Sequence, residues 1–285
     1  MNRKELVRMM MVGLAAIWLF SACSKDDNTT TSSDVESIAI NNVAANDAFN
    51  DVYAESEDVV TVEQASNFAN ASLQKSTSTN GRSVAVSIAT DTTITITYNG
   101  YTGANGRKKD GTIIAKQTGK MWEKNAKRTL TLQNFTLNDS ILVEGTAIVT
   151  NLGWVNFKLT LEFNIQDAKV TNLTTGNWVA FNNKYTLTWD RGSALTSIWD
   201  DTFIVKGHGE GSNQNGHKYT ITISENNPLF MRPGCPWIIQ GETELKVNED
   251  KSATINFGIG LCDGKFTISM DGTDKELESL QGSGM

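Results

Sequence analysis

The sequence predicts a mainly β protein: a large antiparallel β-meander (a curved sheet, a sandwich or a partly open barrel) preceded by one or two N-terminal α-helices. Three observations carry this prediction. Many segments after Val84 alternate apolar and polar residues with a period of two, and the run from Phe157 to Ile165 is the clearest. This alternation is typical of strands with one buried face. Short polar turns join these segments without helical stretches between them, and only residues 35–75 show the 3.6-residue spacing of a helix.

The chain begins with a basic head, in which Arg3, Lys4 and Arg8 precede an apolar run from Met9 to Phe20. This arrangement is typical of a secretory signal peptide, and the run is shorter than the roughly 20 residues that span a bilayer. We therefore expect residues 1–22 to be a signal peptide that is removed.

Cys23 follows small residues and resembles the acylated cysteine of a bacterial lipobox, although Phe20 stands where that motif usually has Leu or a small aliphatic residue. A plain signal peptide cleaved after Ala22 is the alternative. The count of three cysteines favours lipidation, because acylation of Cys23 leaves Cys235 and Cys262 as a pair. Acyl chains contribute about 0.8 kcal/mol per buried CH₂, so two or three would anchor the chain firmly.

Residues 23–34 are expected to form the lipidated cysteine and a flexible polar tether. The residues that follow Cys23, Ser24-Lys25-Asp26-Asp27, resemble the acidic signal that directs lipoproteins of the Bacteroidota to the outer face of the outer membrane. A solvated acidic leash is the alternative. The expected location is therefore the outer membrane, with the protein held by its lipid anchor and facing the cell exterior.

The charge balance bears on partners. The whole chain has a formal net charge of −7, and removal of the signal takes away three positive charges and one negative charge, which leaves −9. Nucleic-acid binding requires a basic surface, so we expect no nucleic-acid partner. The same balance argues against electrostatic docking on anionic lipid.

The predicted domain boundaries follow from the change in the spacing of apolar residues, from 3.6 residues to two. Residues 35–75 are expected to be helical, with apolar residues such as Val35, Ile38 and Phe49 on one stripe and Thr61 as a possible cap of a second helix. Residues 84–271 are expected to form the antiparallel β domain of about eleven strands. Residues 272–285 remain as a C-terminal tail.

An internal repeat predicts where the sheet bends. Residues 141–161 align with residues 203–223 at a constant offset of 62, and residues 238–241 repeat the opening of this pattern. Each copy begins with two aliphatic residues, a polar residue and a glycine. A glycine inside a strand usually marks a bulge or a bend. We therefore expect strong curvature near Gly145, Gly207 and Gly241.

The two remaining cysteines fall on one predicted hairpin. A turn at residues 248–251 would place Val247 opposite Ser252, and Cys235 would then lie opposite position 264, two residues from Cys262. A bulge at the glycines 258 and 260 could absorb the difference. Geometry and an oxidising compartment thus permit a disulfide, worth roughly 3 to 4 kcal/mol by the chain-entropy model. Two buried free thiols are the alternative.

Four blocks resemble segments of uncharacterised surface-exposed lipoproteins of the Bacteroidota: NGRKKDGTII (105–114), VEGTAIVTNLG (143–153), GCPWIIQG (234–241) and NFGIGLCDGKFTISMDG (256–272). With the leader and the helical segment, the resemblance extends over most of the chain. Leu261 departs from it, because a small polar residue is expected before Cys262. The resemblance implies location and architecture only, since this family has no activity to carry over.

The sequence lacks the motifs of common catalytic classes, including the nucleophile elbow, the phosphate-binding glycine loop, the zinc-binding helix motif and the calcium loop. The chain has two histidines. A hairpin turning about Gln214 would place His208 and His217 on opposite faces and exposed, so we expect neither a metal site nor a cofactor. Residues 107–109, Arg-Lys-Lys, are predicted to be a solvated turn.

Tryptophans supply the candidate ligand contacts. Trp189 falls on an apolar face and is predicted to be in the core. Trp122 lies in a polar stretch and Trp154 follows a predicted hairpin turn. Burial is favoured for each, but an exposed indole would offer a flat face to a sugar ring or a partner protein.

These features favour a non-enzymatic binding or structural role, with a glycan or an envelope protein as the partner and the membrane contacted through the lipid anchor. One alternative is a carbohydrate-active enzyme that uses Asp190 with Asp200 or Asp201, since paired carboxyls can hydrolyse glycosides. The other alternative is a carrier of an apolar ligand inside the curved sheet.

Overall fold

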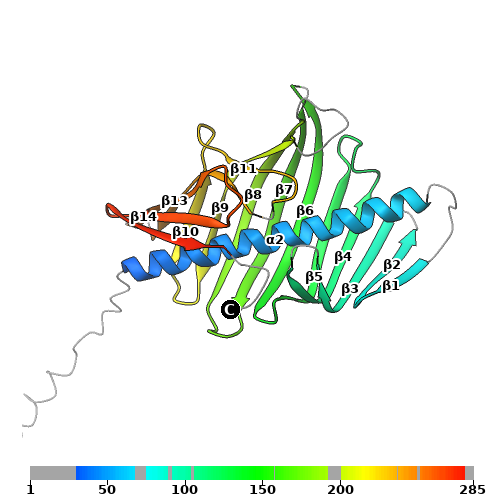
Figure 1. Cartoon of the computed structure of the whole chain (residues 1–285), viewed down its shortest axis with the longest axis horizontal. Coiled ribbons are helices and arrows are strands. Elements are labelled where there is room, and N and C mark those ends of the chain that lie inside the picture. Colours follow the sequence, from blue (N-terminus) through cyan, green and yellow to red (C-terminus); the bar gives the residue numbers. More distant parts are fainter. Residues whose placement is uncertain are drawn as a thin grey trace, which may run out of the picture.

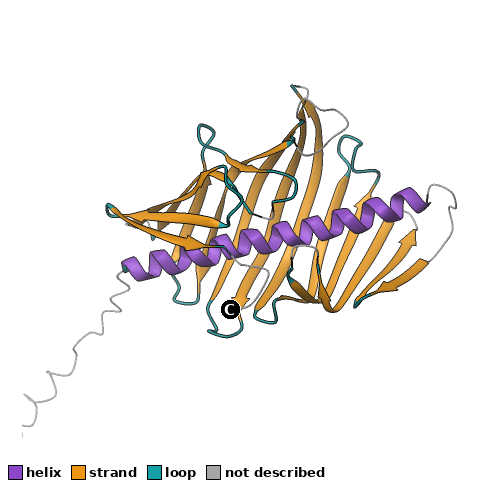
Figure 2. Cartoon of the chain, viewed as in Figure 1, coloured by secondary structure: helices purple, strands orange, loops and turns teal. Residues whose placement is uncertain are grey.

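A computed structural model of the chain describes residues 30–67, 75–88, 92–103, 106–156, 158–191, 200–235, 237–248 and 251–279. The predicted signal peptide, Cys23 and residues 24–29 of the predicted tether lie outside the described residues. Figures 1 and 2 show one long helix lying across the concave face of a large antiparallel sheet. The mainly β meander predicted from the sequence is confirmed.

The described residues form a single helix, α2 (Ser32–Asn67), rather than two, and fifteen strands rather than about eleven. The strands are β1 (Lys75–Thr79), β2 (Arg82–Ile88), β3 (Thr92–Thr102), β4 (Lys108–Thr118), β5 (Lys127–Leu137), β6 (Ile141–Val155), β7 (Lys158–Asn172), β8 (Trp178–Asp190), β9 (Thr202–Asn213), β10 (Lys218–Ile223), β11 (Leu229–Met231), β12 (Gln240–Val247), β13 (Lys251–Ile259), β14 (Lys265–Met270) and β15 (Thr273–Glu278).

The sheet follows chain order from β1 to β15, with β11 set beside β9 and β12. Strand β15 lies in what was predicted to be the C-terminal tail, so that prediction was wrong for residues 273–278.

In a meander the connections alternate between two ends of the sheet. We call one the tryptophan end, formed by the β4–β5, β6–β7, β8–β9 and β13–β14 connections. The other, with the β3–β4, β9–β10 and β12–β13 connections, is the entry end.

The helix packs into the sheet through aromatic contacts. Phe49 meets Phe181 edge to face, with ring centroids 5.7 Å apart, and Tyr53 meets Phe163 in the same way at 4.8 Å. The sheet also curls toward the first half of the helix, which contacts β13 and β14 as well as β8 (Figure 1). Most side chains between Val35 and Val52 are therefore buried or half-buried.

The helix begins earlier than predicted because Thr31 and Asp34 form a capping box. The Thr31 backbone N–H and hydroxyl donate to Asp34 Oδ2 at 2.9 and 2.6 Å, and the Asp34 N–H donates to the Thr31 hydroxyl at 3.2 Å. Residues 32–34, assigned to the flexible tether from their polar composition, belong to the helix. These contacts satisfy backbone donors that the first helical turn leaves without partners.

The start of the helix is fastened to the entry end of the sheet. Asn248 donates its amide N–H to the Thr30 hydroxyl at 2.8 Å, and the same amide nitrogen lies 2.9 Å from Nδ1 of His217. His217 Nε2 lies 3.5 Å from Asp34 Oδ1. His217 is buried, not exposed as predicted, because the helix covers its hairpin; His208 is exposed. The register also differs, since His208 faces Thr222 rather than residue 220.

A buried ionic network joins the middle of the helix to β2 and β4. Asp47, Asp51 and Glu55 recur every four residues and so share one face of the helix. Arg107, just before β4, and Lys109, within β4, are 2% and 0% exposed, so the prediction of a solvated turn is wrong for both. Lys108, between them, points outward to Asp139, as expected when successive strand residues alternate between the two faces of a sheet.

The contacts of this network are specific. Lys109 Nζ lies 2.9 Å from Glu55 Oε1 and 3.3 Å from Asp51 Oδ2. Arg107 donates to the Asp47 backbone carbonyl at 3.2 Å and lies 3.9 Å from Oδ2 of Asp47 and Oδ1 of Asp51. Three carboxylates are matched by Arg107, Lys109 and Arg82, the last of which lies 3.5 Å from Glu55.

Tyr98 completes the network on β3. Its hydroxyl donates to Glu55 Oε2 at 3.1 Å. Burial raises the pKa of this phenol far above its usual value, and the nearby Glu55 carboxylate raises it further. Tyr98 therefore remains a protonated hydrogen-bond donor at physiological pH.

The predicted glycine bends are present. Gly145, Gly207 and Gly241 have φ values of 122°, 145° and 107°, which side chains rarely tolerate. A Cβ at each position would come within 2.6, 2.2 and 2.1 Å, respectively, of backbone atoms of Ala168 in β7, Lys184 in β8 and Pro228 just before β11. The strand register shifts at Gly145 and Gly241, which marks a β-bulge at each.

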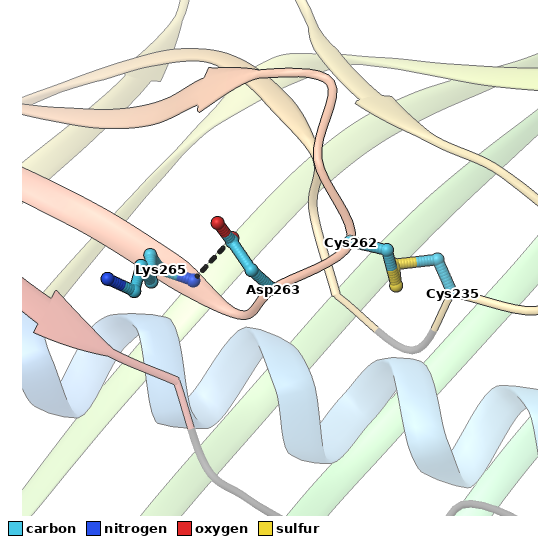
Figure 3. Close-up of a disulfide and its surroundings, with 4 residues drawn as sticks. All are labelled: Cys235, Cys262, Asp263 and Lys265. Carbon is cyan, nitrogen blue, oxygen red and sulfur yellow. Dashed lines mark hydrogen bonds between the residues drawn. A yellow bond between two sulfur atoms is a disulfide. The ribbon is translucent and has the colours of Figure 1, made fainter.

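The disulfide between Cys235 and Cys262 is present, with Cα atoms 5.8 Å apart. It joins the segment before β12 to the β13–β14 connection, where Asp263 accepts a hydrogen bond from the Lys265 backbone N–H (Figure 3). The expected hairpin register was off by one residue, because Val247 faces Lys251 and not Ser252.

Lys109→Ala should destabilise the fold by about 3–5 kcal/mol, because it removes the cation that lies nearest to the Asp51 and Glu55 carboxylates. Urea unfolding followed by circular dichroism measures this loss. Lys108→Ala is the matched control, since its ion pair with Asp139 is exposed and exposed pairs contribute little. Equal effects of the two substitutions would contradict the assignment of Lys109 to a buried network.

The contribution of Asp34 to the free energy of unfolding should vary with pH. Hydrogen bonds from the Thr31 hydroxyl and N–H hold the pKa of this carboxyl below its usual value. A depressed pKa contributes stability above the unfolded-state value of about 3.9, and that contribution is lost as the pH falls through the lower folded-state value. Asp34→Asn should cost about 0.5–2 kcal/mol at pH 7 and progressively less below pH 4. A pH-independent difference in unfolding would refute this role.

Candidate functional site

A row of large apolar side chains crosses the helix-facing side of the sheet near the tryptophan end. Residues paired across neighbouring strands share a face of the sheet. The strand registers pair Trp154 with Leu159, Leu159 with Trp189, Trp189 with Phe203 and Phe203 with Met231. We call these five residues the outer row; it runs across β6, β7, β8, β9 and β11.

A second apolar row lies between the outer row and the helix. Leu161, Leu187, Val205 and Leu229 are successive cross-strand partners on β7, β8, β9 and β11. We call these four residues the inner row, and the two rows together the apolar strip. Alternation along each strand places both rows on the same face as Tyr185 and Phe163, which pack against the helix.

The strip continues into a narrow cleft beside α2. The cleft has a volume of about 50 Å³, and Asn46, Phe49, Asn50 and Tyr53 form its helical wall. Its opposite wall consists of mostly apolar sheet residues: Leu130, Ala147, Phe163, Ile165, Tyr185, Leu187 and Val205. Burial raises the pKa of Tyr185, so its hydroxyl remains a donor to Asn46, at 3.4 Å.

The outer row is only partly covered. Trp154 is 58% exposed, and the other four members are half-buried. Trp189 is predicted to be a core residue but lies on this open strip. Its indole N–H donates to Asp201 Oδ2 at 2.7 Å, and the Phe203 ring centroid lies 6.2 Å from its own. The Arg191 guanidinium lies 5.6 Å from the indole centroid, which is a cation–π distance.

The β4–β5 connection, residues 119–126, brings Trp122 to the same end of the sheet. Asn151 of β6 donates its amide N–H to the Met121 carbonyl at 2.6 Å, which fixes this connection against the strand. Trp122 is 57% exposed, and Lys120 Nζ lies 5.5 Å from the centre of its ring. The preference for burial of Trp122 and Trp154 was therefore wrong, since more than half of each side chain is exposed.

Sequence reasoning missed most of the strip. Leu159, Leu187, Phe203, Val205 and Met231 each looked like an ordinary buried strand position. Their periodicity was visible, but the strand pairings that align them in rows were not. Three other exposed hydrophobic residues, Val155, Ile259 and Leu261, also lie at the tryptophan end. Their common location becomes visible only in the folded structure.

The carboxylates considered for glycoside hydrolysis do not converge in the described residues. Asp190 follows Trp189 along β8 and therefore points to the opposite face, where Lys158 Nζ lies 2.6 Å from its Oδ2. Asp201 is 3% exposed and accepts the Trp189 indole N–H. Asp200 is exposed in the turn before β9. This arrangement gives no groove flanked by an acid and a base.

Within the described part of the chain, no group of three or more His, Cys, Asp or Glu side chains is arranged to hold a metal ion. The described helix is also too polar to cross a bilayer. Comparison with known protein families, with curated proteins and with solved structures gives no match.

Asp201→Ala should destabilise the protein by about 1–3 kcal/mol, because the half-buried Trp189 N–H loses its acceptor. The Trp189 ring should also become more mobile, which would lower the near-ultraviolet circular dichroism signal. Asp200→Ala is the matched control at the neighbouring exposed position. Unchanged spectra and unfolding midpoints for Asp201→Ala would contradict this role for the buried carboxylate.

Proposed function

We propose that the protein is a lipid-anchored, surface-facing lipoprotein of the outer membrane with a non-enzymatic binding role. The observation that carries the binding role is the apolar strip, in which Trp154 is exposed, six members are half-buried, and only Leu161 and Leu229 are buried. Monomeric soluble proteins rarely leave such contiguous apolar surfaces uncovered without a partner. The anchor and the location rest on the leader, Cys23 and the acidic residues that follow it.

The point at which the chain enters the fold supports an outward-facing strip. Seven peptide steps separate Cys23 from Thr30, so a fully extended tether spans at most about 25 Å. Thr30 is bonded to Asn248 at the entry end, whereas the strip lies toward the tryptophan end. Strand β8, which joins the two ends, is 13 residues long and spans roughly 40 Å. An acylated Cys23 would thus hold the entry end nearest the membrane.

The partner predicted from the sequence is a glycan or an envelope protein, with Trp122 and Trp154 as contacts. Their exposure and their common end of the sheet support this choice. The carbohydrate-active enzyme has less support, since Asp190 and Asp201 point to opposite faces. A carrier of an apolar ligand is the second candidate, because the strip and its cleft are lined by aliphatic as well as aromatic side chains.

The location is tested by digesting intact cells with protease. The native protein should be degraded while a periplasmic control survives, and Cys23→Ala should abolish acylation, seen as loss of labelling by an alkyne fatty acid. Survival of both proteins would reject exposure at the surface. Continued labelling of the Cys23→Ala variant would reject the anchor.

Binding is tested with purified capsular polysaccharide, O-polysaccharide freed of its lipid, and peptidoglycan fragments, each immobilised on a sensor surface. Trp154→Ala should weaken saturable binding by about tenfold, since an indole contact contributes about 1–2 kcal/mol. Leu173→Ala is the control, because Leu173 is an exposed apolar residue at the entry end. Equal affinities for both variants would remove Trp154 from the site.

A further inference from the structure

We infer that the apolar strip binds an amphiphile with a single acyl chain and an anionic head group. This inference rests on the proposed function, in that it uses the strip as the binding surface, and it names the chemical class of the ligand.

The lining of the strip favours an alkyl chain over a sugar. Every member of the two rows is apolar, and six of the nine are aliphatic side chains of Leu, Val or Met. The polar groups beside them already have partners: Asp201 accepts from Trp189, and Asn151 Oδ1 accepts from the Gly153 N–H at 2.6 Å. Sugar hydroxyls that lie over the two rows would lose their hydrogen bonds to water and gain none from these side chains, whereas methylene groups have no such hydrogen bonds to lose.

The shape of the strip also fits a chain. The outer row crosses five strands, and four spacings of about 4.8 Å give a length of roughly 19 Å. The inner row lies alongside it, so the apolar surface is long and only two side chains wide. The cleft between Tyr53 and Val205 adds about 50 Å³ at the helical side, which accommodates the end of a chain but not a ring system.

Three positively charged side chains lie beside the strip, on a protein whose net charge is −7. Arg191 lies over Trp189 at 5.6 Å, in the middle of the outer row. Lys120 lies over Trp122 at 5.5 Å, and the Lys124 side chain passes over Gly153, beside Trp154. Two carboxylates partly offset these cations: Glu123 lies in the same connection as the two lysines, and Asp201 accepts the Trp189 indole N–H. Cations next to an apolar surface complement a carboxylate or phosphate on an acyl chain.

The test uses residues 23–285 without acylation, which contain every described element, and 9,10-dibromostearate, whose bromine atoms quench nearby tryptophan fluorescence. Saturable quenching with one ligand per protein is expected, and Trp154→Phe should reduce its amplitude. Unbrominated stearate should compete. Lysophosphatidic acid and stearate as competitors distinguish a phosphate from a carboxylate head, and either result supports an anionic amphiphile.

Two matched pairs of variants locate the ligand. Leu187→Gln should raise the dissociation constant at least about tenfold, since it places an amide on the inner row, whereas Thr186→Gln on the opposite face should not. Arg191→Gln should weaken binding of dibromostearate but leave its methyl ester unaffected, and Lys184→Gln on the opposite face should change neither. Circular dichroism confirms folding, and the surface position of Arg191 keeps that variant informative if Leu187→Gln unfolds.

Absence of quenching, or equal affinity for the acid and its methyl ester in the native chain, would overturn the inference. So would equal affinities within both pairs of variants. If the protein does not bind dibromostearate but binds an envelope glycan through Trp154, the inference of an amphiphilic ligand is wrong and the proposed function stands. Loss of both kinds of binding would refute the two together.

Discussion

The buried ionic network between α2 and the sheet fixes the arrangement on which the rest of the structure depends. Lys109 and Arg107 meet Asp47, Asp51 and Glu55 away from solvent. Burying such charges is costly unless each finds its partner, so a helix shifted along the sheet would leave carboxylates and cations unmatched. We regard the network as the feature that sets the position of the helix, a role attested for buried polar groups in other helical assemblies.

That position has a consequence for the exposed surface. The helix covers the half of the concave face nearer the entry end, where Arg107 and His217 reach it, and leaves the half nearer the tryptophan end less covered. The apolar strip lies in this less covered half, where Trp154 is exposed and six of the other members are half-buried. A sheet normally buries its apolar face against another layer. Here one helix crosses the strands and is too narrow to cover their whole length. The part of the concave face that it leaves less covered is the surface to which we assign ligand binding.

The curl of the C-terminal strands secures the same arrangement from the other side. Close backbone approach at Gly207 and Gly241 bends the sheet, the Cys235–Cys262 disulfide closes the last hairpins, and hydrogen bonds from Asn248 hold the start of the helix. The chain therefore enters the fold at one end and presents the strip toward the other. In an anchored protein this geometry would turn the binding surface outward.

The sequence by itself determined the antiparallel meander, the glycine bends and the cysteine pairing, because alternation, backbone freedom and turn spacing are local properties of the chain. Only the tertiary structure decided which charged residues are buried and which apolar residues stay open. Arg107 and Lys109 resembled a solvated turn until the helix supplied carboxylates from more than fifty residues away. Trp189 resembled a core residue because it alternates with polar residues along its strand. Its burial depends on whether the helix that packs on the sheet extends over it, and the local sequence pattern does not show how much of the sheet the helix covers.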